Sequence, residues 1–201
     1  METMTTSIIL PFLVFFPFLG AVISYIIGRS NKGARDIWCW ILSAVIFIAS
    51  LTLIGKETVY SLRGFCGLGL SFAADGFGVI LAVLTGAIWL ITTIFSKEYM
   101  AAERNRNRYY FFVFLTLGAT MGIFLSADLF TTFIFFEIMS FTSFVLVMHD
   151  EEDFTVRSAK TYLAVAVIGG LVTLMGLFMM YQKAGTLNMT ELTAFMQSRE
   201  N

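Results

Sequence analysis

One acidic residue lies in the middle of a long apolar segment. Glu137 is the only charged residue in Leu129 to Met148, LFTTFIFFEIMSFTSFVLVM. As a helix rising about 1.5 Å per residue, this segment is long enough to cross about 30 Å of hydrocarbon. Its carboxylate would lie about 12 and 16 Å from the two ends, out of reach of either surface. An ionisable group at this depth costs about 2.5 to 3.5 kcal/mol on insertion scales, so it indicates a function.

The chemistry of Glu137 is that of a reversible proton carrier. A buried carboxyl without a partner stays protonated, whereas a nearby cation restores the charged form. A carboxyl held between these limits can take up and release a proton. Ser140, one helical turn further on, adds a hydroxyl to the same face. The alternative interpretation is a carboxyl that only fixes helix packing through an interhelical hydrogen bond.

Three other polar residues lie near the ends of apolar segments. Lys160 falls about a turn inside the lipid boundary, where it either extends to the headgroups or acts on the Glu137 proton. Asp128 suits the N-cap of the Glu137 helix, with a mouth for cations as the alternative. His149 is a candidate for proton uptake from the surface, although a lone interfacial histidine commonly has no such role.

The composition is that of an integral membrane protein. The 201 residues are 58% hydrophobic and 13% charged, with a mean hydropathy of +0.81, whereas a soluble domain carries about 25% charge. The net charge of -1 gives no basic patch for nucleic acid. One histidine, and two cysteines (Cys39 and Cys66) without ligand spacing, predict no metal or haem. No cofactor fingerprint or nucleophile-base pair occurs, so we expect no cofactor and no redox chemistry in this chain.

Six apolar runs reach spanning length, which predicts an all-α membrane protein with a single transmembrane domain over 1–201. The expected spans are 7–28, 37–55, 77–95, 109–125, 129–148 and 158–181. The outer loop 56–76 has short β-compatible pieces broken by glycines, and is either a small hairpin or irregular. Asp75 at its end suits an N-cap. The three residues between the fourth and fifth spans make those two spans antiparallel neighbours.

Basic residues predict the orientation of these spans. The first, third and fifth loops hold eight lysines and arginines, and the opposite side holds four: Arg29, Lys32, Arg35, Lys97, Arg104, Arg106, Arg108 and Arg157 against Lys56, Arg63, Lys183 and Arg199. We therefore expect a multi-pass protein of the cell (inner) membrane with its N-terminus outside. The opening METMTTS has no basic region of a signal peptide, so the first span is expected to be retained.

Three further features concern the end of the chain. Gly169, Gly170 and Gly176 allow either a close helix approach or a local break in the sixth span. The acidic run 150–153 is typical of a solvated connector. The tail from Gly185 onward is weakly amphipathic, which favours a position at the membrane interface.

Two strings resemble one known family. ADLFTTFIFFEIMSFTSFVLV and SAKTYLAVAVIGGLVTLMGLFMMYQKAGTLN resemble the antiporter-like subunits of respiratory complex I, membrane-bound hydrogenases and multisubunit Na⁺/H⁺ antiporters. Within this family, the two strings most resemble the M-type subunit of complex I and its D-type counterpart in the antiporters. GLGLSFAADGFGVIL also looks like the pattern ahead of the family's third helix. The resemblance covers most of 65–188.

The resemblance implies roles for individual residues. In that family a glutamate in the fifth helix is paired with a lysine on the seventh and forms part of a proton half-channel, and Glu137 falls on the glutamate's position. Lys160 falls where many members have a lysine early in the sixth helix. Family members have about fourteen helices in two inverted repeats. This chain stops after the sixth helix, so we expect a truncated or split member, or a neighbouring subunit that supplies the remainder.

The resulting expectation is a proton- or Na⁺-translocating subunit of a complex I-like NADH:quinone oxidoreductase or membrane-bound hydrogenase. Its site residues are Glu137, Lys160 and Ser140, with proton uptake near His149 or Asp128. The partners are the lipid bilayer and other membrane subunits of a multisubunit complex. One alternative is a component of a multisubunit cation/proton antiporter, and another is a scaffold that transports nothing. The sequence leaves the choice between H⁺ and Na⁺ open.

Overall fold

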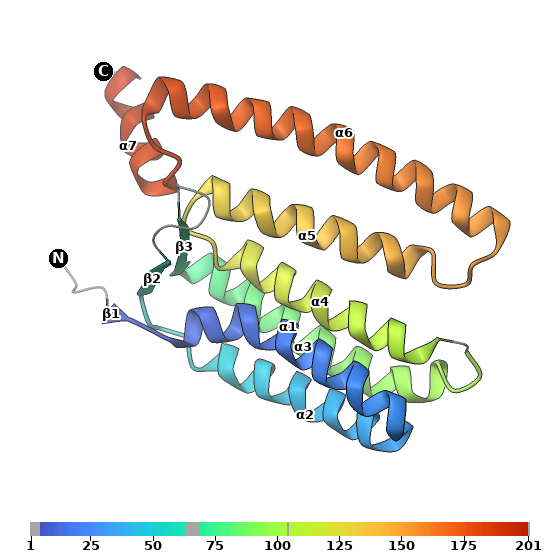
Figure 1. The fold of residues 1–201 in the computed structure, drawn as a ribbon. Coiled ribbons are helices and arrows are strands. Elements are labelled where there is room, and N and C mark those ends of the chain that lie inside the picture. The colour runs from blue at the N-terminus through green and yellow to red at the C-terminus, as the bar shows by residue number, and fades with distance from the viewer. Residues whose placement is uncertain (1–4, 63–68, 104, 201) are drawn as a thin grey trace.

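The computed structural model describes residues 5–62, 69–103 and 105–200 as a layered helical bundle with a small sheet at one end (Figure 1). The helices are α1 (Ile9–Ser30), α2 (Lys32–Leu51), α3 (Gly76–Tyr99), α4 (Arg106–Phe124), α5 (Leu129–Val147), α6 (Asp153–Ala184) and α7 (Met189–Glu200). The strands are β1 (Thr5–Thr6), β2 (Thr58–Leu62) and β3 (Leu70–Ala74).

Of the six predicted spans, five have a counterpart among the candidate membrane helices of the described residues. Within the described ranges, α1, α2, α3, α5 and α6 are long and apolar enough to cross a membrane. The fourth predicted span forms as α4, but it does not meet that criterion. Its first turn carries Arg106 and Arg108, and its packed positions include Thr116 and Thr120. Because α4 packs against both α1 and α5, small and polar residues can stabilise it through helix contacts that a lipid-facing helix lacks.

α3 and α6 extend beyond the apolar runs that predicted them, whereas α2 both starts and ends before its predicted span of 37–55. The N-terminal end of α2 is Lys32, because the Asn31 side chain accepts hydrogen bonds from the N–H groups of Gly33 and Ala34. α6 has 32 residues, about 48 Å. It continues without interruption through Gly170, so the alternative of a broken sixth span is wrong. The polar tail, expected at the interface, forms the helix α7.

The loop between α2 and α3 contains a β-hairpin, which confirms the first of its two alternatives. β2 and β3 are antiparallel, with Thr58 opposite Ala74 and Leu62 opposite Leu70. β1 pairs with β2 in parallel. The predicted loop residues Arg63 and Cys66, and Arg104 in the third loop, lie outside the described residues.

The hairpin holds the start of α5 in place through backbone hydrogen bonds. Ala73 N–H donates to the Leu125 carbonyl and Ala127 N–H to the Ser71 carbonyl, each over 2.8 Å. Leu129 N–H donates to the Leu187 carbonyl over 3.0 Å. The hairpin, the α4–α5 turn and the α6–α7 connection thus meet at one end of the bundle, here called the hairpin end (Figure 1).

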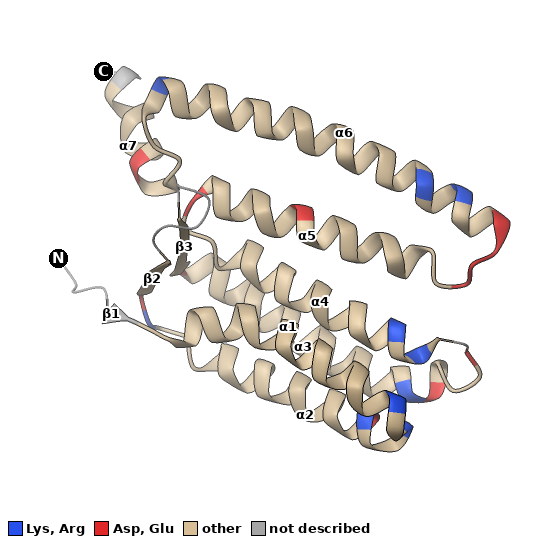
Figure 2. Cartoon of the chain, viewed as in Figure 1, with Lys and Arg blue, Asp and Glu red and all other residues tan. Residues whose placement is uncertain are grey.

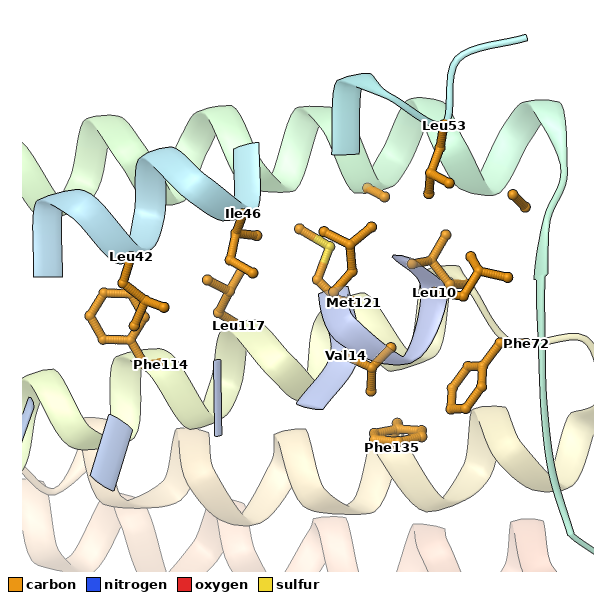
Figure 3. Packing of buried hydrophobic residues seen from close by; sticks show 14 of the residues in the cluster. Leu10, Val14, Leu42, Ile46, Leu53, Phe72, Phe114, Leu117, Met121 and Phe135 are labelled. Atoms are coloured by element: carbon orange, nitrogen blue, oxygen red, sulfur yellow. The ribbon is translucent and has the colours of Figure 1, made fainter. Parts of the chain in front are cut away.

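The core lies between α1, α2 and α4. Figure 3 shows Leu42 and Ile46 of α2 beside Phe114 and Leu117 of α4, and all four are buried. Phe135 of α5 joins this core. The predicted antiparallel neighbours α4 and α5 do pack together, and α6 packs mainly against α5 as the outermost layer. The Glu137 helix therefore lies between the core and α6.

Candidate ion-translocation site

Glu137 lies in the middle of α5, on the side that faces α6. Figure 2 shows a single acidic band there, eight residues after Leu129 and ten before Val147. The side chain is half-buried. A Cβ atom on Gly170 of α6 would lie 2.5 Å from Glu137 Oε1 and 2.8 Å from Oε2. The carboxylate therefore lies directly against the backbone of α6, at a position that only glycine leaves open.

The carboxylate has no polar partner among residues 5–62, 69–103 and 105–200. It makes no hydrogen bond there and no salt bridge. The interhelical hydrogen bond required by a pure packing role is therefore not formed within the described part of the chain. A charged carboxyl in the middle of a membrane span is costly unless a partner offsets its charge.

α6 covers this site with a narrow stripe. Its buried positions are Ala159, Gly170 and Leu177, which are small or apolar and lie along the side toward α5. The remaining faces of α6 expose Val165, Val167, Ile168, Leu171, Val172, Met175, Phe178 and Met179. One helix thus separates Glu137 from the exterior of this chain.

Ser140 and a set of threonines bring hydroxyls to the same region. Ser140 is buried one turn from Glu137, and the structure records no hydrogen bond between them among the described residues. On the α4 side of α5, the hydroxyls of Thr142 and Thr116 lie 2.9 Å apart. Thr120 is buried one turn further along α4 and donates to the Thr116 carbonyl. Hydroxyls therefore occupy the α4–α5 contact, whereas Glu137 faces α6.

Lys160 does not meet Glu137. It is exposed on α6, ten residues before Gly170, a separation of about 15 Å along the helix axis. No ion pair of Lys160 is present in the described ranges. The exposure of Lys160 and its distance from Gly170 favour the first of its two interpretations, in which the side chain extends to the headgroups.

Asp128 is the N-cap of α5, which confirms the first of its two interpretations. Its Oδ1 accepts from the Thr131 N–H over 2.7 Å, and its Oδ2 accepts from the Thr131 hydroxyl over 2.6 Å. Asp75 caps α3 in the same way, through the Gly78 N–H at 2.7 Å. Both oxygens of Asp128 are engaged in ordering the start of α5.

His149 lies at the opposite end of α5. Its ring is T-shaped to that of Tyr109, with centroids 5.8 Å apart, and both ring nitrogens are buried without a hydrogen-bond partner among the described residues. Its carbonyl accepts from Arg108, which also pairs with Glu151. All four residues of the acidic run 150–153 are exposed, as predicted for a solvated connector, and Glu151 also ties it to α4.

A buried ionic network at this end was not predicted. Arg35 counted in the sequence only as a loop charge, yet it is 0% exposed inside α2. It donates to Asp36 over 2.7 Å, lies over the Tyr110 ring at 4.7 Å, and Arg106 also reaches Asp36 at 3.3 Å. The adjacent opposite charges of Arg35 and Asp36, a few residues after a capping asparagine, were the signal that these residues lie inside the helix.

The basic residues gather at one end of the bundle. Figure 2 shows them around the α1–α2, α3–α4 and α5–α6 connections, here called the basic end, away from the hairpin. Lys56 and Lys183 lie at the hairpin end. This segregation is the one expected of helices that cross a bilayer.

Comparison with known proteins places this arrangement in a family. Residues 126–201 match the family described as NADH:quinone oxidoreductase/Mrp antiporter, TM. The chain is 30% identical to the putative antiporter subunit mnhD2 of Staphylococcus epidermidis, over 98% of this chain and 40% of that one. The chain is a partial antiporter-like membrane subunit of the Mrp and complex I type. It spans about 40% of the length of the curated relatives it matches.

Solved structures show the same antiporter-like fold. One chain of the membrane-bound sulfane sulfur reductase, an archaeal respiratory membrane complex, superposes with a TM-score of 0.82 at 18% identity, over 92% of this chain and 39% of that one. A chain of the Mrp complex from Dietzia sp. gives 0.74 at 23% identity, over 90% and 20%. The antiporter-like subunit is thus a multi-pass membrane protein, and the two solved chains that share its fold come from a respiratory membrane complex and an Mrp complex.

Proposed function

We propose that this antiporter-like subunit contributes the first part of an ion path, in which Glu137 is the reversible proton carrier. The observation that carries the proposal is the position of the Glu137 carboxylate against Gly170, mid-helix and without a polar partner among the described residues. Such a group binds a proton readily and releases it when a cation comes near. A partner subunit, or further chain, would supply that cation from the uncovered side of α6.

The other predicted residues take lesser parts in this proposal. Ser140 is one turn from Glu137 and is the nearest hydroxyl along α5 that could relay a proton. Lys160, about 15 Å away along α6, acts on that proton only through its long-range field. His149, with its two buried ring nitrogens that have no partner in the described ranges, is the candidate for proton uptake at the basic end. The geometry of Asp128 favours capping over uptake.

We place the basic end in the cytoplasm and the N-terminus outside. The support is the clustering of lysine and arginine at the α1–α2, α3–α4 and α5–α6 connections. On this orientation, the hairpin and α7 lie on the outer face. A proton taken up near His149 then enters from the cytoplasmic side.

Between the two kinds of complex considered, the curated relatives favour the cation/proton antiporter over the redox-driven pump. The relatives matched over nearly the whole chain are named putative antiporter subunits, whereas the archaeal respiratory complex supports the fold alone at 18% identity. The redox-driven assembly, with NADH or hydrogenase subunits as neighbours, is the second candidate. Both use the same proton chemistry at Glu137.

A vesicle assay separates the two. Everted membrane vesicles that contain the complete complex are given a transmembrane pH gradient, and then Na⁺ or K⁺ is added without any electron donor. The antiporter proposal predicts that the cation dissipates the gradient in these vesicles and not in vesicles from cells lacking this chain. The redox-driven pump predicts a different result. Added Na⁺ or K⁺ would then leave the pH gradient unchanged, and proton uptake would start only when an electron donor is added.

A further inference from the structure

A cavity opens at the basic end, apart from the Glu137 site. It has a volume of about 930 Å³ and lies where the α1–α2 connection meets the start of α4. Among the described residues, four basic side chains line it: Lys32, Arg35, Arg106 and Arg108. Its lining holds one carboxylate among the described residues, that of the exposed Glu103.

The basic side chains of this cavity are incompletely paired. Arg35 and Arg106 share Asp36, and Arg108 pairs with Glu151. The ammonium group of Lys32 has no ion-pair partner within the described ranges. The Nε atoms of Arg106 and Arg108 are buried, and neither has an acceptor in the part of the chain that the structure describes. The cavity therefore presents donors and positive charge in excess of acceptors.

The backbone adds to this excess. Arg106 and Arg108 are in the first turn of α4, which has no acidic residue and no side-chain cap from Asn105. Cations at the positive end of a helix dipole are unfavourable, and an anion there is favourable. A bound anion would offset both the unpaired Lys32 charge and the uncapped start of α4.

The other wall of the cavity is aromatic and reaches the outer surface of the bundle. Tyr25, which is 43% exposed, lies T-shaped against Phe111 with ring centroids 5.8 Å apart. Phe112 follows, 5.2 Å from Phe111. Aromatic residues at this level are typical of a membrane–water interface. The cavity is thus polar on one side and apolar where α1 exposes Val22, Tyr25 and Ile26.

We propose that this cavity binds the head group of one anionic phospholipid, with Lys32 as the main phosphate contact. A soluble phosphate would use the basic residues only, whereas a lipid also uses the aromatic wall and the exposed apolar strip of α1. Basic pockets between transmembrane helices on the cytoplasmic side are suited to acidic head groups. The bound lipid would contact α1, α2 and α4 at the basic end, next to the buried ionic network of Arg35, Asp36 and Arg106.

Lipid binding to the purified 201-residue chain tests the proposal. The chain in neutral detergent is titrated with fluorescent phosphatidylglycerol and, separately, with phosphatidylcholine carrying the same label. We expect saturable binding of phosphatidylglycerol only. Lys32→Gln should weaken this binding about fivefold, the size expected for one lysine at an anionic head group. Lys32 is exposed and unpaired in the described ranges, so the variant is expected to fold, which circular dichroism and gel-filtration elution check.

Arg29→Gln is the matched control. Arg29 is an exposed basic residue at the end of α1 that does not line the cavity, so its loss should change binding less than twofold. Equal binding of the two lipids, or equal effects of Lys32→Gln and Arg29→Gln, would overturn the proposal. Displacement of the lipid by inorganic phosphate at the same concentration would show a site for free phosphate, and would also overturn it.

Discussion

Glu137 and Gly170 lie face to face across the α5–α6 contact, with the carboxylate where a Cβ of residue 170 would otherwise be. The absence of a side chain at 170 therefore sets how deeply the carboxylate can lie between the two helices. α6 touches the rest of the molecule mainly through α5, so this contact also determines where α6 lies. We therefore expect both the packing of α6 and the proposed proton binding at Glu137 to depend on this pair.

Gly170→Ala should disturb both properties. The added methyl would lie 2.5 Å from Glu137 Oε1, which forces the carboxylate or α6 to move, at a cost of about 1 to 3 kcal/mol typical of overpacking. Thermal unfolding of the chain in detergent measures the loss. Gly169→Ala is the control, because nothing lies within 4 Å of its added methyl; it should be neutral or stabilising, as alanine favours a helix over glycine by about 1 kcal/mol. Equal stability of the two variants would contradict the described contact.

Substitutions of Asp128 distinguish its role as an N-cap from a role in cation entry. Asp128→Asn keeps an oxygen for the Thr131 N–H and removes the charge, whereas Asp128→Ala removes both and should cost about 0.5 to 2 kcal/mol. We expect ion transport by the complex to survive Asp128→Asn, and α5 to be destabilised by Asp128→Ala. If transport is abolished by Asp128→Asn while the protein remains stable, the charge itself is needed and the capping account is insufficient.

Asp36 should be the acidic residue whose loss most weakens the fold. Asp36→Ala leaves Arg35, which is 0% exposed, without its carboxylate, and breaking a buried pair costs about 3 to 5 kcal/mol. Removing both charges with Arg35→Met and Asp36→Leu should restore much of the stability. Glu98→Ala, at an exposed position of α3, is the control for loss of an acid. Stability is measured by thermal unfolding. If Asp36→Ala lost no more stability than Glu98→Ala, the buried ionic network would not contribute to the fold as described.

Cysteine labelling tests the orientation. In a variant without Cys39 and Cys66, a cysteine at Asn31 or Asn105 should be shielded from an impermeant thiol reagent added to intact cells, because both positions lie at the basic end. A cysteine at Ser61, on β2 at the hairpin end, should be labelled. Labelling at Asn31 and Asn105 with none at Ser61 would show that the basic end lies outside the cell.

Hydropathy located the elements of this fold because apolar runs mark helices directly. It placed α5 nearly to the residue, and the capping role of Asp128 followed from the residue type. It placed the starts of α2 and α6 too late, because polar residues such as Lys32 and Asp153 begin each helix before its apolar part. The network at Arg35 was missed because its partners include Arg106, far along the chain, and only packing brings the two together. Gly170 was noted as permitting a close approach, but no sequence pattern says which side chain would approach.

No basic residue in the described ranges lies close enough to be the proposed cationic partner of Glu137. Lys160 was the only basic residue in the apolar part of the sixth span, and the structure puts it about 15 Å from the Gly170 level. The pairing implied by the family resemblance involves a seventh helix. We therefore expect the partner of Glu137 to come from the exposed side of α6.

Ion transport by the complete complex carrying Glu137→Gln tests the central claim most directly. The substitution keeps the volume and hydrogen-bonding capacity of the side chain and removes its proton-carrying carboxyl. Measured with a pH-sensitive dye in everted vesicles, transport should fall to the background of vesicles without this chain, while the amount of assembled complex and the transport of the Glu98→Gln control remain at wild-type levels. Wild-type transport by a fully assembled Glu137→Gln complex would contradict the account and assign Glu137 to helix packing.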